Sequence, residues 1–150
     1  MQLDLELYRE SVEVEPSVRI SYIDVAPERP LHTLVFIHGF GGRARQWRYQ
    51  IEQFARENRV IAIDLRGHGR SDMKRMLADV TAVLDHLQLR QPFVMVGHSF
   101  GVAFATEFAW RYPQRVSHLI LTAGAGEYDI PGYFKLLFRL PPPVTRFLEP

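Results

Sequence analysis

The 150-residue chain contains no cysteine. This absence excludes a disulfide framework, a zinc site built from thiolates and a cysteine nucleophile. An excess of either charge is also missing, because 18 Lys and Arg residues stand against 17 Asp and Glu residues, for a formal net charge of +1. No basic stripe interleaves with aromatic residues, so we expect no nucleic-acid partner.

Long apolar runs are absent as well. None approaches the roughly 20 residues of a membrane helix. The acidic, alternating start MQLDLELYRE lacks the basic and apolar regions of a signal peptide. We therefore expect no membrane span and a cytoplasmic location. With 47% hydrophobic and 23% charged residues, the chain has the composition of a globular domain.

What is present is an alternation of short apolar runs with amphipathic helical patterns. Period-two alternation near the N-terminus, from Leu3 to Leu7 and again at Val12 and Val14, predicts an antiparallel hairpin that continues through residues 18–25. Strands and helices that then alternate predict an α/β fold with a doubly wound, mostly parallel sheet. Further strands are expected to begin at residues 33, 59, 93 and 116, and helices are expected at 46–57, 76–87 and 100–112.

The segment Gly97-His98-Ser99-Phe100-Gly101 lies between an apolar strand and a helical pattern. This G-x-S-x-G arrangement is typical of a nucleophile elbow, in which a sharp turn places the serine in strained backbone angles. The serine hydroxyl is then exposed at a helix N-terminus, where backbone N–H groups favour a developing oxyanion. Ser99 is therefore the candidate nucleophile, against the alternative of an ordinary polar residue in a turn.

A second glycine-rich turn, His38-Gly39-Phe40-Gly41-Gly42, follows the first strand expected to be parallel. An acyl-transfer enzyme of this architecture needs an oxyanion donor at that place. The backbone N–H of Phe40 would supply one donor and the backbone N–H of Phe100 the other. This prediction concerns backbone geometry and assigns no role to the two side chains.

Three stretches resemble the N-terminal signatures of the α/β-hydrolase superfamily: VFIHGFGGRARQW, VIAIDLRGHGRSD and MVGHSFGVAFATEFAWRYPQRV. The resemblance implies an eight-stranded sheet, a lid after the sixth strand and a Ser–acid–His triad with Ser99 as the nucleophile. Residues 1–124 would form the N-terminal part of the core, and residues 125–150 would begin the lid. Haloalkane dehalogenases and epoxide hydrolases of this superfamily place Asp at the elbow, so Ser99 favours ester or acyl chemistry.

The triad acid and base are not evident in the sequence. Their order in this fold is Ser, acid, His, yet no histidine follows His118. Glu127 and Asp129 are weak candidates for the acid. We therefore expect a sheet truncated after its sixth strand, with the base beyond residue 150 or absent. An apolar sheet edge would then be exposed, and this edge or the YFKLLF tail would promote self-association.

A competing interpretation is a dinucleotide-binding turn. Gly39, Gly41 and Ala44 follow a strand with suitable spacing, and Asp64 ends the next strand, where a ribose acceptor would lie. The preceding hairpin argues against this interpretation, which also leaves the Ser99 turn unexplained. We expect Asp64 to be structural.

We expect the histidines to have structural roles and not to act as catalytic bases or metal ligands. His38 is expected to be buried and hydrogen-bonded, His98 to pack beside the elbow, and His68 to support a loop. No histidine pair has metal-ligand spacing, so no metal site is expected. The sequence thus predicts a cofactor-free serine hydrolase for a small, apolar acyl compound. The alternative is a catalytically silent binding or assembly module.

Overall fold

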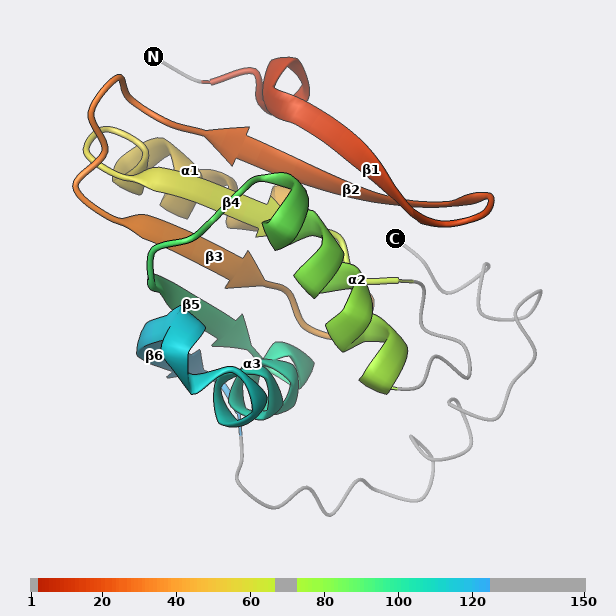
Figure 1. Cartoon of the computed structure of the whole chain (residues 1–150). Coiled ribbons are helices and arrows are strands. Elements are labelled where there is room, and N and C mark those ends of the chain that lie inside the picture. The colour runs from red at the N-terminus through yellow and green to blue at the C-terminus, as the bar shows by residue number, and fades with distance from the viewer. Residues whose placement is uncertain (1–2, 67–72, 125–150) are drawn as a thin grey trace.

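The computed structural model describes residues 3–66 and 73–124. The expected lid, with Glu127 and Asp129, and the loop that contains His68 lie outside the described residues. Six strands form a single sheet in the order β1-β2-β4-β3-β5-β6 (Figure 1). Their bounds are β1 Arg9–Glu15, β2 Val18–Val25, β3 Thr33–Ile37, β4 Arg59–Ile63, β5 Phe93–His98 and β6 Val116–Thr122.

Strand directions confirm the predicted fold class. β1 and β2 form an antiparallel hairpin, and β2 also pairs antiparallel with β4. β3 runs parallel to both β4 and β5, and β5 runs parallel to β6. Ile37 is in register with Ile63 on one side and with Gly97 on the other. The carboxyl ends of β3, β4 and β5 therefore meet at one edge, where ligands bind in open α/β sheets.

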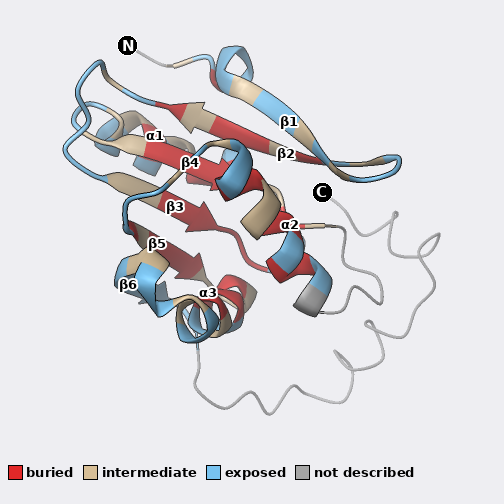
Figure 2. Ribbon diagram, in the orientation of Figure 1, coloured by how far each residue is buried: buried red, intermediate tan, exposed pale blue. Residues whose placement is uncertain are grey.

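Helices cover both faces of the sheet, as a doubly wound fold requires. Side chains of α2 (Met73–His86) and α3 (Phe100–Arg111) pack on one face, in a core cluster with Val35, Ile37 and Ile61. The 3₁₀ helix η2 (Ala44–Trp47) and helix α1 (Arg48–Phe54) supply Ala44, Trp47 and Ile51 to a second cluster on the opposite face. The central strands are buried between the two layers (Figure 2).

One local prediction was wrong. Residues Leu5–Tyr8 form a 3₁₀ helix, η1, where period-two alternation predicted a strand. The carboxylate of Asp4 accepts a hydrogen bond from the Glu6 N–H and caps this turn. Only Leu5 of the turn is buried, while Leu7 is exposed.

The two edges of the sheet differ in chemistry. β1 carries Arg9, Glu10, Glu13 and Glu15 along its seven residues. β6 has the sequence VSHLILT, without an acidic residue, Lys or Arg, and its residues after Val116 are exposed. Charges on an edge strand discourage pairing with another chain. The expected apolar edge is therefore present at β6.

Within residues 3–66 and 73–124, no helix is long and apolar enough to cross a membrane. The same part of the chain contains no cluster of three or more His, Cys, Asp or Glu residues that could hold a metal ion.

Candidate active site

Ser99 occupies the turn between β5 and α3. Its backbone angles are φ 52° and ψ −116°, a strained combination for a residue with a side chain. The Ser99 carbonyl accepts the Val102 N–H at 3.0 Å, inside the first turn of α3. The sharp strand-to-helix reversal predicted from the G-x-S-x-G pattern is thus present.

The glycines on either side of Ser99 allow β5, α3 and β3 to pack closely against one another next to this turn. A Cβ atom on Gly97 would lie 2.5 Å from the Gly101 carbonyl oxygen. A Cβ atom on Gly101 would lie 2.6 Å from the carbonyl oxygen of Ile37, the last residue of β3. Because these obstacles are backbone atoms, no side-chain movement could relieve the clash. The tight packing of β5, α3 and β3 therefore requires glycine at both positions.

The turn His38–Gly42 lies directly against the elbow. A Cβ atom on Gly39 would be 3.0 Å from the Ser99 Cβ atom and 3.2 Å from the His98 carbonyl oxygen. The turn is closed by the Gly42 N–H, which donates to the Gly39 carbonyl at 3.1 Å. Phe40 follows Gly39, and Phe100 follows Ser99. The structure thus brings together the two segments that carry the predicted site residues.

The side chain of His38 supports this turn through hydrogen bonds to the backbone. Its side chain is buried, its Nδ1 atom lies 2.7 Å from the Gly39 carbonyl oxygen, and its Nε2 atom accepts the Leu65 N–H at 2.9 Å. Nδ1 therefore carries the ring proton. Burial lowers the pKa of His38 from its ordinary value. The predicted buried, hydrogen-bonded imidazole is confirmed.

Asp64 links three segments beyond the end of β4. One carboxylate oxygen accepts the Ala44 N–H at 2.5 Å, and the other lies 2.8 Å from the Arg9 guanidinium. The Asp64 N–H donates to the Ser21 carbonyl at 2.9 Å. Both carboxylate oxygens therefore have partners within the protein, as expected of a structural residue and not of a ribose acceptor.

Arg66 makes an ion-pair network that the sequence did not reveal. Two nitrogens of its guanidinium each lie 2.6 Å from an oxygen of Asp79 on α2, and a third contact of 2.9 Å reaches Glu15. The Asp79 side chain is buried. The hydrogen bond to Asp79 contributes most to raising the pKa of Arg66. Because the partners are 13 and 51 residues away, no local pattern could have indicated the pairing.

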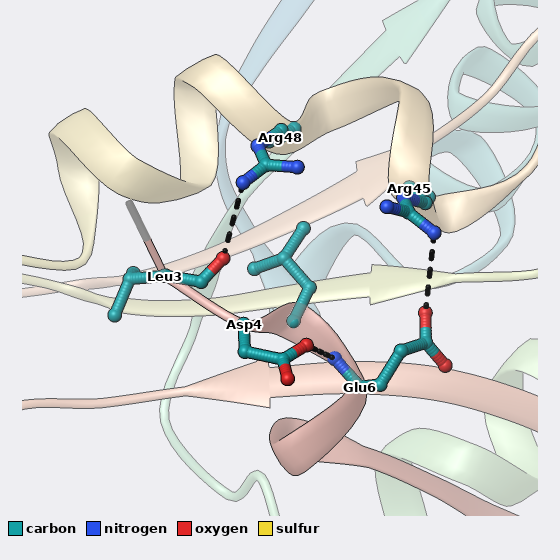
Figure 3. A pocket seen from close by; sticks show the side chains of 6 residues that line it. Leu3, Asp4, Glu6, Arg45 and Arg48 are labelled. Atoms are coloured by element: carbon teal, nitrogen blue, oxygen red, sulfur yellow. Dashed lines mark hydrogen bonds and ion pairs between the residues drawn. The ribbon is translucent and has the colours of Figure 1, made fainter. Parts of the chain in front are cut away.

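A pocket of about 230 Å³ lies elsewhere, between η1 and the η2–α1 segment (Figure 3). The Arg48 guanidinium donates to the Leu3 carbonyl at 3.3 Å, and the Arg45 guanidinium lies 3.9 Å from the Glu6 carboxylate. Opposite charges thus face one another across this pocket, and none of the predicted site residues lines it.

Comparisons with known proteins place the chain in a family. Residues 32–143 match the alpha/beta hydrolase fold family, so the chain belongs to it. The chain is 42% identical over 100 residues to the dihydrolipoyllysine-residue acetyltransferase component of the acetoin cleaving system of Pseudomonas putida, covering 62% of this chain. It is 37% identical over 123 residues to epoxide hydrolase B of Mycobacterium tuberculosis, covering 73% of this chain.

Solved structures show the same fold. A carboxylesterase structure from Nitrososphaera gargenis matches with a TM-score of 0.72 at 28% identity, over 87% of this chain and 51% of that chain. The chain spans 27% and 34% of the lengths of the Pseudomonas and Mycobacterium relatives. The prediction of an α/β-hydrolase is therefore confirmed at the level of family, while activity and site roles are matters for proposal.

Proposed function

We propose that this chain carries the nucleophile and the oxyanion hole of a serine hydrolase that cleaves a carboxylic ester or a related acyl bond. The observation that carries the proposal is the strained backbone of Ser99, at φ 52°, on a strand-to-helix turn packed against Gly39. Such a turn exposes a serine hydroxyl beside backbone N–H groups that can stabilise negative charge.

In the proposed reaction, the Ser99 Oγ attacks the acyl carbonyl carbon and its proton passes to a general base. The carbonyl oxygen becomes an oxyanion that accepts hydrogen bonds from the N–H groups of Phe40 and Phe100. Collapse breaks the ester C–O bond, and the leaving alkoxide takes a proton from the base. Water then cleaves the acyl-enzyme, releasing the acid and restoring the Ser99 hydroxyl.

His38 is not the base in this scheme. Both of its ring nitrogens are engaged with backbone groups, those of Gly39 and Leu65. We propose that the triad acid and base come from a part of the whole protein outside residues 3–66 and 73–124. Removing triad members leaves only the contribution of substrate binding and the oxyanion hole.

Ester chemistry is favoured over epoxide opening by the residue at the elbow. Epoxide hydrolase B is among the relatives, but the superfamily's epoxide hydrolases use an Asp nucleophile and this chain has Ser99. The similar carboxylesterase fold supports an acyl substrate. Phe40, 43% exposed in the turn beside Ser99, offers an apolar surface for a small acyl group.

Labelling with a fluorophosphonate probe tests the proposal. We expect one covalent adduct, located on Ser99 by peptide mass spectrometry and abolished in Ser99→Ala. Ser117→Ala is the matched control, because Ser117 is an exposed serine on β6, and it should label like the original chain. If the probe leaves a protein with native circular dichroism unmodified, these 150 residues do not carry an active nucleophile, and the silent role described next is favoured.

The exposed β6 edge favours a second role, that of a catalytically silent binding or assembly module. Leu119, Ile120 and Leu121 are 36%, 45% and 45% exposed on that strand. A protein that self-associates through β6 and resists the probe would fit this role. A cytoplasmic location and independence of cofactors stay predictions.

A further inference from the structure

The side chain of His98 packs against Gly39, inside the turn that carries the proposed oxyanion donor Phe40, and against Trp47 in η2, which follows that turn. Its Nδ1 atom lies 3.2 Å from the point where a Gly39 Cβ atom would be. Its ring meets the Trp47 ring edge to face, with centroids 6.1 Å apart and planes at 89°. We propose that His98 is a positioning residue, with its ring proton on Nε2, that holds the His38–Gly42 turn against Ser99.

The protonation state follows from two buried atoms. His98 Nδ1 and Trp47 Nε1 are both buried without a hydrogen-bond partner among the described residues. The indole nitrogen can only donate, so a proton on His98 Nδ1 would place a second unpaired donor beside it. An unprotonated Nδ1 avoids this second donor and leaves a lone pair on the ring that meets the indole. The ring proton therefore belongs on Nε2.

Gly39 is consequently in contact with two imidazoles in opposite tautomers. His38 donates from Nδ1 to the Gly39 carbonyl at 2.7 Å, while the unprotonated Nδ1 of His98 lies 3.2 Å from the position of a Cβ atom on Gly39. The next residue is Phe40, whose N–H must lie about 2.7–3.1 Å from the oxyanion. A shift of Gly39 moves this donor directly. The identity and tautomer of His98 therefore set the geometry of the proposed oxyanion hole.

The tautomer is tested first, because this readout does not depend on enzymatic activity. Long-range ¹H–¹⁵N spectra of the whole chain at pH 7.5 should show the His98 proton on Nε2. In Trp47→Phe the indole donor is lost, and a fraction of His98 should shift to the Nδ1–H tautomer. His38 should show the Nδ1–H tautomer in both proteins, as an internal control. A predominantly Nδ1–H form of His98 in the original chain would overturn the inference.

The positioning role rests on the proposed function and is tested by the rate of fluorophosphonate labelling. His98→Leu, which keeps the bulk but removes the acceptor, should slow labelling of Ser99 by about tenfold or more, since small misplacements are costly. His98→Asn, whose amide oxygen can occupy the place of Nδ1, should recover most of the rate. His86→Leu, at an exposed position on α2, should leave the rate unchanged.

The outcomes separate the two claims. Labelling of His98→Leu at the original rate would overturn the positioning role while leaving Ser99 as the nucleophile. A folded original chain that does not label would contradict the proposed function, and the tautomer measurement would then decide on His98 alone. If His98→Leu fails to fold, Trp47→Phe takes its place, and an unchanged labelling rate in that variant overturns the role.

Discussion

The Ser99 N–H donates a hydrogen bond of 3.0 Å to the carbonyl oxygen of Thr122, the last residue of β6. The strained elbow is thus tied to the end of the exposed edge strand. The Thr122 hydroxyl strengthens this link with a contact of 3.4 Å to the Gly97 carbonyl. Fraying of β6 would release the Ser99 backbone, so the site depends on the sheet edge.

We predict that the β6 edge makes the chain self-associate. Ile120→Lys places a charge on a strand that has no acidic residue, Lys or Arg, and it should shift the protein toward the monomer, because edge charges oppose intermolecular pairing. Light scattering coupled to size-exclusion chromatography measures the change. Glu13→Lys, on the already charged β1, is the control and should not alter the oligomeric state. A chain that is monomeric before substitution would contradict this prediction.

The close approach at Gly101 predicts a large loss of stability in Gly101→Ala. The new Cβ atom would meet the Ile37 and His38 carbonyl oxygens at 2.6 and 2.8 Å, so α3 must move away from β3. We expect a loss of about 3 kcal/mol in the free energy of unfolding, at the upper end for overpacking. Urea denaturation provides the measurement.

Gly41→Ala is the matched control for this substitution. Gly41 has φ +66°, but a Cβ atom added there would meet no atom within 4 Å, so only backbone strain opposes the methyl group. A loss of about 1 kcal/mol is expected from a left-handed alanine. Equal losses in the two variants would show that α3 does not pack against β3 as closely as described.

Arg66 binds two carboxylates, those of Asp79 and Glu15, and we predict that removing each one lowers the free energy of unfolding by a different amount. Asp79→Ala leaves Arg66 without its buried partner and should lower the free energy of unfolding by about 3 kcal/mol. Glu15→Ala removes a carboxylate that is 46% exposed and should cost less than about 1 kcal/mol. Urea midpoints of both variants test this ordering, and a costlier Glu15→Ala would refute it.

Because His38 is buried, we predict that the free energy of unfolding falls in mild acid. Because burial lowers its pKa in the folded protein, the unfolded chain binds a proton more readily as the pH falls. The stabilisation is therefore full above the unfolded pKa of about 6.5 and is lost as the pH falls from there through the folded pKa. Urea midpoints at pH 7.5 and pH 5 should differ less in His38→Asn than in the original chain.

The exposed His86 provides the control for this pH dependence. His86→Asn should leave the difference between the two midpoints unchanged, because the His86 side chain is exposed on α2 and lies outside the buried core. An undiminished difference in His38→Asn would instead assign the acid sensitivity to other groups.

Local patterns were sufficient to predict the segments around the proposed site. The apolar run of β5, the glycines at 97 and 101 and the helical pattern that follows are adjacent in sequence, so the turn at Ser99 could be read directly. The buried state of His38 could also be predicted, because it immediately follows a buried strand. These features rest on neighbours a few residues apart.

Features that rest on tertiary contacts could not be read in the same way. The alternation of Leu3, Leu5 and Leu7 fits a strand, but only the folded chain shows that Leu5 alone meets the core and that the Asp4 cap closes a 3₁₀ turn. The Asp4–Glu6 spacing was a signal that could have indicated this cap. The contact between Trp47 and His98 joins residues 51 positions apart, and it became visible only through the sheet.

The most direct test of the central claim is a crystal structure of the fluorophosphonate adduct. We predict phosphorus bonded to the Ser99 Oγ, with the phosphoryl oxygen about 2.7–3.1 Å from the backbone nitrogens of Phe40 and Phe100. An adduct on another residue, or a phosphoryl oxygen directed away from both amides, would contradict the account.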